Sequence, residues 1–334
     1  MLFGALVLLD MGWLIGQFTT DRWHWSQWLW WIPTPIALAA TLLILLLVSI
    51  HTRLKKRHHP EVQNRELSLG MFQEKIRGNF VGRFLWGWRI AFVLMLARFG
   101  LIEHRWFHAP SQNPQGVRLV HWTMSHPRTP DQIEQHAAPL IALNGDITIL
   151  SEAWMIQRSP SLQEWLGELQ TTRRVGRFTL FTRFPILELR SLIATKTIRL
   201  DLAIIDTTSK IGRPLTMYLI DLPSRPRYSR MKIVNLTQTM MKEVNAPPPD
   251  LVVGDFNITR GSASLKKLFP DLHDAWNDAG HGYGASFHRR FPLYHIDHVL
   301  LAPHLQATRY DLIDPGVGRH DLQVAHIQSS SSAP

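Results

Sequence analysis

Cysteine is absent from the 334 residues, which excludes disulfides, thiolate metal sites and cysteine nucleophiles. Its absence does not decide the compartment, because cysteine-free chains work on either side of a membrane. Acidic residues are also in the minority, since 36 Lys and Arg stand against 26 Asp and Glu. Residues 1–116 carry 12 basic and 6 acidic side chains, whereas residues 117–334 carry 24 and 20. The near balance in the second part does not indicate nucleic acid as a partner, although it permits one.

Charge is missing altogether from residues 28–50, WLWWIPTPIALAATLLILLLVSI, a length sufficient to cross a bilayer. Three tryptophans lie at one end of this run, where interfacial anchors occur. Residues 2–18 form a second apolar run with one acid, Asp10. This run lacks the basic start and small-residue cleavage site of a signal peptide. We therefore predict two transmembrane helices joined by a short loop.

The segment 51–83 is a strongly basic loop, which the positive-inside rule places in the cytoplasm. Residues 84–102 are apolar but contain Arg89 and Arg98, each near one end and able to snorkel to an interface. If this segment spans, the C-terminal part lies outside the cytoplasm; if it is an interfacial amphipathic helix, that part is cytosolic. We favour the span. The expected anchor over residues 1–102 thus holds two or three transmembrane helices in a lipid bilayer.

Residues 103–116 are rich in Pro, Asn, Gln and Gly and are expected to be a linker before a soluble domain at 117–327. The tail at 328–334 is expected to be disordered. Alternating apolar runs predict strands at 117–122, 146–150, 176–182, 197–206, 214–221, 250–256, 295–301 and 321–327. Helical periodicity predicts helices at 129–145, ended by Gly145, and 228–244. Strands with helical insertions predict an α/β (α+β) fold rather than a plain sandwich.

The run Leu251-Val252-Val253-Gly254-Asp255-Phe256-Asn257 ends a predicted strand with an acid and an amide two residues apart. In extended backbone these two side chains point the same way. The pair suits deprotonation of water beside a phosphate, with the amide steadying the phosphoryl oxygens. An Asx turn that ends the strand is the simpler alternative.

Three further segments place polar groups beside apolar strands. Glu152 directly follows a buried strand and offers the hard oxygen that Mg²⁺ prefers. Asp297 lies inside an otherwise apolar strand, so it should have a partner, either a histidine or a metal. Arg319, His320 and Asp321 precede the last strand and put a base beside an acid.

The series LSE, TRFPI, VVGDFN, HIDHVLL and terminal GRHD resembles the endonuclease/exonuclease/phosphatase superfamily over nearly all of residues 117–327. The resemblance implies two packed mixed sheets flanked by helices in a four-layer sandwich. It also implies hydrolysis of a phosphate-ester substrate with Mg²⁺ or Mn²⁺. Carried over by position, Glu152 would bind metal, and Asp255 would orient or activate the attacking water at the metal. Asn257 would support the phosphoryl oxygens, and Asp297 would hold the catalytic histidine.

Three positions depart from the family pattern. Thr123 stands where an Asn near the metal is usual, and Asp221 stands where a phosphate-binding His is usual. The usual terminal Ser-Asp-His is here Arg319-His320-Asp321, either because the loop is one residue short or because the pair is inverted. The short loop, which we prefer, keeps His320 as the base and lets Arg319 bind phosphate. The other register would put Asp321 in the histidine's place. The histidines without metal spacing, any of which could substitute for a lost catalytic one, are His121, His126, His281 and His288.

We therefore expect a membrane-anchored, metal-dependent phosphodiesterase or phosphatase that uses a metal-bound water. The alternative is a catalytically impaired domain of the same fold that acts as a binding module, because residues that act as a unit fail together. A cytosolic nuclease tethered to the membrane is a third hypothesis. The substrate and the oligomeric state lie beyond the sequence.

Overall fold

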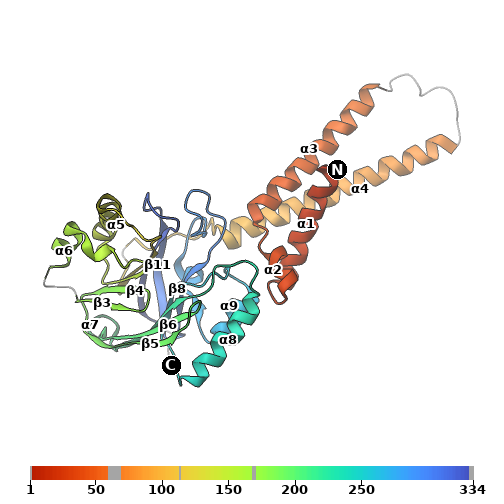
Figure 1. Ribbon diagram of the computed structural model, residues 1–334. Coiled ribbons are helices and arrows are strands. Elements are labelled where there is room, and N and C mark those ends of the chain that lie inside the picture. The colour runs from red at the N-terminus through yellow and green to blue at the C-terminus, as the bar shows by residue number, and fades with distance from the viewer. Residues whose placement is uncertain (1, 59–68, 113, 168–170, 331–334) are drawn as a thin grey trace. The chain divides into compact units, whose positions relative to one another are not determined.

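The computed structural model describes residues 2–58, 69–112, 114–167 and 171–330 (Figure 1). The chain divides into two compact units. One comprises residues 1–20 and 25–104, and the other comprises residues 21–24 and 105–334. The first unit is helical, and the second contains all the strands of the described chain.

The helices of the first unit are α1 (Leu2–Thr19), α2 (His24–Trp30), α3 (Thr34–His58) and α4 (Leu69–Arg98), followed by a π-helical turn (Phe99–Glu103). Three stretches are long and apolar enough to cross a membrane: Leu2–Thr19, Thr34–Leu54 and Gly82–Glu103. Inside this unit, the Thr41 hydroxyl of α3 donates to Asp10 Oδ2 of α1 at 2.8 Å, so the lone acid of α1 has a polar partner.

Two details of the expected anchor are corrected. The uncharged run at 28–50 is not one helix, because α2 ends at Trp30 and α3 begins at Thr34, in a segment that contains Pro33 and Pro35. The basic segment 51–83 is helical at 51–58 and 69–83 rather than a loop, since it has no proline in those stretches and many helix formers. Residues 59–68 lie outside the described part of the chain.

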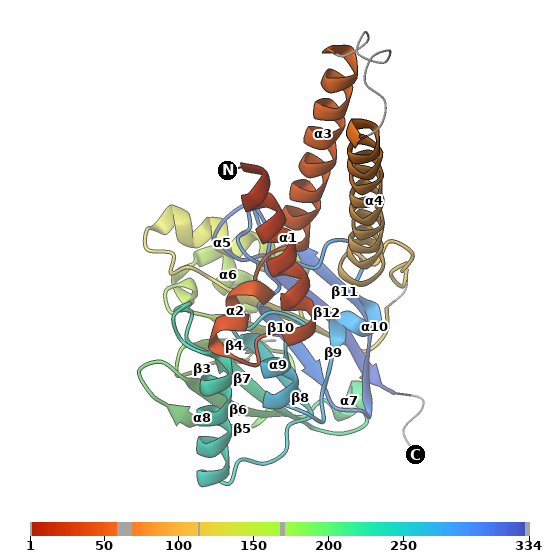
Figure 2. The same cartoon turned by 90° about the vertical axis from the view of Figure 1, so that its right-hand side faces the viewer.

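The second unit holds two mixed six-stranded sheets, as predicted (Figures 1 and 2). The first sheet has the order β11-β12-β1-β2-β4-β3, and the second has the order β5-β6-β7-β8-β10-β9. The β1–β2 and β7–β8 pairs are parallel and the other neighbours are antiparallel. The strands are β1 (Val117–Thr123), β2 (Ile147–Ser151), β3 (Thr171–Val175), β4 (Phe178–Thr182), β5 (Ile186–Ala194), β6 (Arg199–Ile205), β7 (Leu215–Asp221), β8 (Leu251–Asp255), β9 (His273–Asp274), β10 (Asp297–Leu301), β11 (Leu305–Ile313) and β12 (Leu322–Ser329).

Helices cover the outer face of each sheet, which gives four layers (Figure 1). The helices of this unit are α5 (Pro130–Leu143), α6 (Pro160–Leu166), α7 (Thr208–Ile211), α8 (Arg230–Glu243), α9 (Ala263–Leu268) and α10 (Ala275–Ala279), with a 3-10 turn at Ile156–Arg158. Buried residues of both sheets form the central core, among them Leu119, Ile149, Met217 and Val253. Trp122 packs outward under α5 and α6, and Tyr218 packs outward under α8 and α9. Hydrophobic burial on both faces therefore holds the strand ends in place.

All eight predicted strands and both predicted helices of this unit are present, with small differences at their ends. Helix α5 ends at Leu143, and its C-cap is Asn144 in the left-handed conformation (φ 48°) and not Gly145 as predicted. Strand β12 includes Gln328 and Ser329, which we expected in the disordered tail, because both pair with β11. Residues 331–334 of that tail lie outside the described part of the chain.

Candidate active site

Three carboxylates line up across neighbouring strands of the second sheet. Asp221 at the end of β7 pairs in register with Asp255 at the end of β8, and Asp255 pairs in register with Asp297 at the start of β10. All three are buried. The apolar runs that precede Asp221 and Asp255 and follow Asp297 form the strands, so the acids meet at one edge of the sheet.

Gly254 permits this close approach. Its φ is +152°, and a Cβ added there would lie 1.9 Å from the Ile220 carbonyl oxygen of β7. No side chain fits at that distance, because the carbonyl belongs to the backbone of the neighbouring strand. The glycine of the GDFN motif is therefore required by the packing of β8 against β7, next to Asp255.

Asp297 accepts three hydrogen bonds from side chains. The Thr123 hydroxyl donates to Oδ1 at 2.9 Å, and the Ser286 hydroxyl donates to Oδ2 at 2.6 Å. The third partner is His320, whose Nδ1 lies 2.9 Å from Oδ2. A carboxylate accepts, so Nδ1 carries a proton and the tautomer of His320 is set. The Trp122 indole N–H donates to the His320 carbonyl at 3.0 Å and holds the backbone of this residue.

Burial and charge shift the pKa values of these groups in opposite directions. Burial and the charge of Asp297 raise the pKa of Asp255 well above its ordinary value. Burial would lower the pKa of His320, but the charge and hydrogen bond of Asp297 outweigh it and raise that pKa to about 9. Burial would raise the pKa of Asp297, yet His320 outweighs it and lowers it. The site thus holds a carboxyl that readily takes a proton beside an imidazolium that can give one.

Glu152 lies beside two basic side chains. Its carboxylate is 3.2 Å from His126 Nε2 and 3.8 Å from Arg177 Nη1, and it has a positive φ of 55° directly after β2. Arg177 also makes a 2.7 Å ion pair with Asp221. Burial raises the pKa of Asp221 to about 6, although Arg177 opposes the rise. Arg177 therefore links Glu152 to the row of acids.

The remaining predicted site residues lie at the edge of this group. The Asn257 backbone N–H donates to Asp255 Oδ1 at 3.0 Å, and its side-chain amide donates to the Leu222 carbonyl at 2.9 Å. This is an Asx-type turn, so the simpler interpretation of that motif describes the local geometry. Arg319 is exposed, with its guanidinium 5.4 Å from the centre of the Phe287 ring.

The sequence did not point to Arg177, to Ser286 or to the pairing of His126 with Glu152. Nothing local distinguishes Arg177 from the exposed arginines at 173 and 174. It reaches the site because β4 pairs with β2, and the Glu152 N–H donates to the Arg177 carbonyl at 3.1 Å. His126 also lines a pocket of about 350 Å³ together with Arg128, Trp154 and Met155, so this pocket adjoins Glu152.

The donor set suits a divalent cation. Asp255, Asp297 and His320 each offer a ligand atom within 4.8 Å of the others, and Glu152 lies outside that close group. Burial raises the pKa values of Asp255 and Asp221, and the charges of neighbouring carboxylates add to the rise, so these acids repel one another when ionised. An oxygen-ligated cation such as Mg²⁺ would relieve this repulsion. Of the two predicted metal ligands, only Asp255 belongs to the close group.

A family model described as the Endonuclease/Exonuclease/phosphatase family matches residues 99–330. The chain belongs to the endonuclease/exonuclease/phosphatase family. Members of this family are hydrolases of phosphate esters, which supports a phosphoesterase-type activity here. No curated protein matches the chain.

Solved structures of the endonuclease/exonuclease/phosphatase type share the fold at low identity. A mannosyl-6-phosphatase from Bacteroides thetaiotaomicron is 14% identical, with a TM-score of 0.51, over 63% of this chain and 99% of its own. A family protein from the same organism is also 14% identical, with a TM-score of 0.52, over 64% and 98%. One from Beutenbergia cavernae is 14% identical, with a TM-score of 0.50, over 65% and 72%. These likenesses establish the architecture alone.

Proposed function

We propose that this protein is a membrane-anchored, divalent-metal-dependent hydrolase of phosphate esters, either a phosphodiesterase or a phosphatase. The observation that carries the proposal is the buried His320–Asp297 pair directly beside Asp255, at the edge where the three carboxylates meet. In-line attack on phosphorus needs one group that takes the proton of the attacking water and another that protonates the leaving oxygen on the opposite side, and this edge supplies both kinds of group.

Each residue of the site has a task in this proposal. A divalent cation held by Glu152 and Asp255 would lower the pKa of water and neutralise charge on the phosphate. Asp255 takes the proton of the attacking water. His320, with a pKa of about 9, is protonated at neutral pH and donates to the leaving oxygen, while Asp297 holds its ring. Arg319 would bind a phosphate oxygen.

The pocket beside Glu152 is the place for the rest of the substrate. Its lining combines an exposed indole, Trp154, with the basic side chains of His126 and Arg128. Such a lining suits a flat or sugar-like group that carries an additional negative charge.

Hydrolysis of bis-p-nitrophenyl phosphate and p-nitrophenyl phosphate tests the proposal. The full chain, purified in detergent, should turn over one of them with Mg²⁺ or Mn²⁺ and stop in EDTA. Asp255→Asn should lose at least about 100-fold in kcat, whereas Asp271→Asn, which changes an exposed carboxylate outside the site, should not. Turnover that persists in both EDTA and Asp255→Asn would overturn the proposal.

One observation favours the alternative, a binding module without activity. Arg177 already contacts Glu152 and Asp221, and its charge competes with a cation there. In that case no turnover appears with any of these metals, while isothermal titration still detects binding of phosphate esters.

We also propose that all three apolar stretches span the membrane and that the hydrolase domain lies outside the cytoplasm. The support is the length of Gly82–Glu103 and the basic residues that lie at 55–77, between the apolar stretches Thr34–Leu54 and Gly82–Glu103. Alkaline phosphatase fused after Pro334 should be active in bacterial cells, and a green fluorescent protein fused there should be dark. The opposite pair of results would put the domain in the cytosol.

A further inference from the structure

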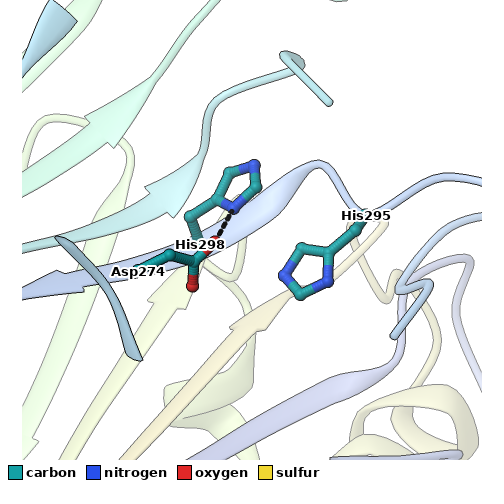
Figure 3. A group of neighbouring side chains, drawn as sticks. All are labelled: Asp274, His295 and His298. Carbon is teal, nitrogen blue, oxygen red and sulfur yellow. Dashed lines mark hydrogen bonds and ion pairs between the residues drawn. The ribbon is translucent and has the colours of Figure 1, made fainter. Parts of the chain in front are cut away.

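A second cluster of buried titratable side chains lies outside the site described above. Asp274 at the end of β9, His298 in β10 and His295 just before β10 each offer a ligand atom within 4.8 Å of the others (Figure 3). Their exposed fractions are 7%, 0% and 6%. The proposed hydrolysis uses none of them.

The hydrogen bond that His298 makes through Nε2 leaves the lone pair of Nδ1 facing the Asp274 carboxylate. Its Nε2 lies 2.8 Å from the Ile258 carbonyl oxygen, which can only accept, so Nε2 carries a proton. In the neutral ring Nδ1 is then bare, and it lies 3.3 Å from Asp274 Oδ2. Two acceptors at that distance repel each other unless a cation, either a proton or a metal ion, lies between them.

The surroundings of His295 favour a metal ion over a proton between His298 and Asp274. Neither of its ring nitrogens has a hydrogen-bond partner among the described residues, and its ring stacks on that of His298 with 4.8 Å between centres. Figure 3 shows one ring nitrogen facing the Asp274–His298 pair. A proton on His298 would leave His295 buried and unsatisfied, which is costly. A neutral imidazole ring has one nitrogen with a free lone pair that can bind a metal.

We propose that Asp274, His295 and His298 bind a structural zinc ion. Ligands 2.0–2.1 Å from tetrahedral zinc are roughly 3.3–3.4 Å apart, which is the separation of His298 Nδ1 and Asp274 Oδ2. His295 completes the set when its ring moves by about 1–1.5 Å. Donation from His298 Nε2–H to a backbone carbonyl is the outer contact that orients a ligating histidine.

Other features of the cluster agree with this assignment. Asp274 Oδ1 accepts from the Trp276 backbone N–H at 3.0 Å, so the start of α10 uses one carboxylate oxygen and leaves the other for zinc. The Trp276 indole N–H and the Tyr310 hydroxyl are also buried without partners among the described residues. A water as the fourth ligand would keep one free lone pair and could accept from one of these two groups. The positive charge of Arg260, whose guanidinium is 5.3 Å from the centre of the Trp276 ring, would weaken the affinity for the ion.

Zinc at this position would join β9 and the start of α10 to β10. His298 directly follows Asp297, so the ion would hold the strand from which the active-site acid projects. The role is positioning and not catalysis. It predicts a loss of stability on metal removal that does not depend on whether the hydrolase proposal is correct.

Metal analysis of the full chain tests the zinc proposal. The protein is purified in detergent through a tag without histidines and dialysed against EDTA, and zinc is then measured by mass spectrometry. We expect one zinc per chain in the wild type and in Glu152→Gln, which removes a ligand of the other site. His295→Phe should lose it, whereas His136→Phe, a change of another buried histidine, should keep it. Stripping with 1,10-phenanthroline should lower the Tm by about 5–10 °C, and added zinc should restore it.

Two results would overturn the proposal: a wild type without tightly bound metal, or the same zinc content in His295→Phe. If His295→Phe does not fold, the wild type refilled with Co²⁺ decides the matter. Intense visible absorption from tetrahedral Co²⁺ with nitrogen ligands supports the site, and its absence refutes it.

Discussion

Asp297 Oδ2 lies 2.9 Å from His320 Nδ1, and the same oxygen accepts from Ser286 at 2.6 Å. Asp297 comes from β10, and His320 comes from the loop before β12. Strands β10 and β12 belong to different sheets. The pair therefore exists only when the two sheets are packed together. Because the carboxylate raises the pKa of His320 to about 9, the pair sets the protonation state of the site.

Asp297→Asn should return His320 to a lower pKa, since burial alone lowers it. The alkaline limb of the pH profile of kcat/KM, expected near pH 9 in the wild type, should move down by about 2 units. Ser286→Ala removes one hydrogen bond but keeps the charge, so its limb should move by less than half as much. An unchanged limb in Asp297→Asn would mean that His320 does not act as the acid.

The same pair makes stability depend on pH. A histidine whose pKa is higher in the folded protein stabilises it fully below its ordinary value of 6.5, and the contribution is lost as the pH rises through about 9. We expect the Tm of the wild type to fall between pH 7 and pH 9.5, and that of His320→Gln to fall less. Scanning fluorimetry measures both, and equal slopes would contradict the expectation.

Asp321 tests the register of the terminal motif. Burial, then the charge of Asp314, raises the pKa of Asp321 to about 7, and Asp321 Oδ1 has no partner among the described residues. A raised carboxyl pKa destabilises the fold as the pH rises above 3.8. Asp321→Asn should therefore gain about 1 kcal/mol at pH 8 and nothing at pH 4. It should stay active, whereas His320→Asn should lose about 100-fold or more. The reverse result would restore the inverted register.

Arg177 contacts both Glu152 and Asp221. Its removal should change the affinity for Mg²⁺ and the pKa of Asp221. Arg177→Gln should lower the concentration of Mg²⁺ for half-maximal activity by about fivefold, because a charge 3.8 Å from Glu152 is lost. It should also raise the pKa of Asp221 above about 6, because the guanidinium that opposes the effect of burial is lost. Arg174→Gln, an exposed arginine on β3, is the matched control. Weaker Mg²⁺ activation in Arg177→Gln would show that the guanidinium does not compete with the metal.

Much of this site could be predicted because its residues follow or interrupt apolar runs. Asp255 ends one buried strand and Asp297 begins another. The apolar composition of these two runs therefore predicts the position of each acid at a strand end. Strands β5 and β11 were missed for a related reason. Their burial does not alternate cleanly along the strand, so the period-2 signal is weak. The start of α3 at Thr34 was not predicted, because it depends on Pro33 and Pro35 and a mean hydropathy over a long window does not register single prolines.

The contacts that join distant segments could not be predicted. Arg177 meets Glu152 through the β2–β4 register, and Thr123 meets Asp297 across the two sheets. The Thr123 hydroxyl donates to Asp297, a role that its position at the end of β1 did not suggest. Such pairs depend on the packing of the whole domain, and a single sequence carries no local record of that packing.

Gly254 gives a prediction that concerns the architecture alone. Gly254→Ala places a methyl group 1.9 Å from the Ile220 carbonyl oxygen, and neither strand can move without disturbing the β7–β8 ladder. We expect a loss of at least about 3 kcal/mol, or failure to fold. Gly212→Ala has a positive φ of 86° but open space around it, so it should cost only about 1 kcal/mol. Urea unfolding of the two variants measures the difference. Equal costs would mean that backbone conformation, and not the neighbouring strand, requires the glycine of the GDFN motif.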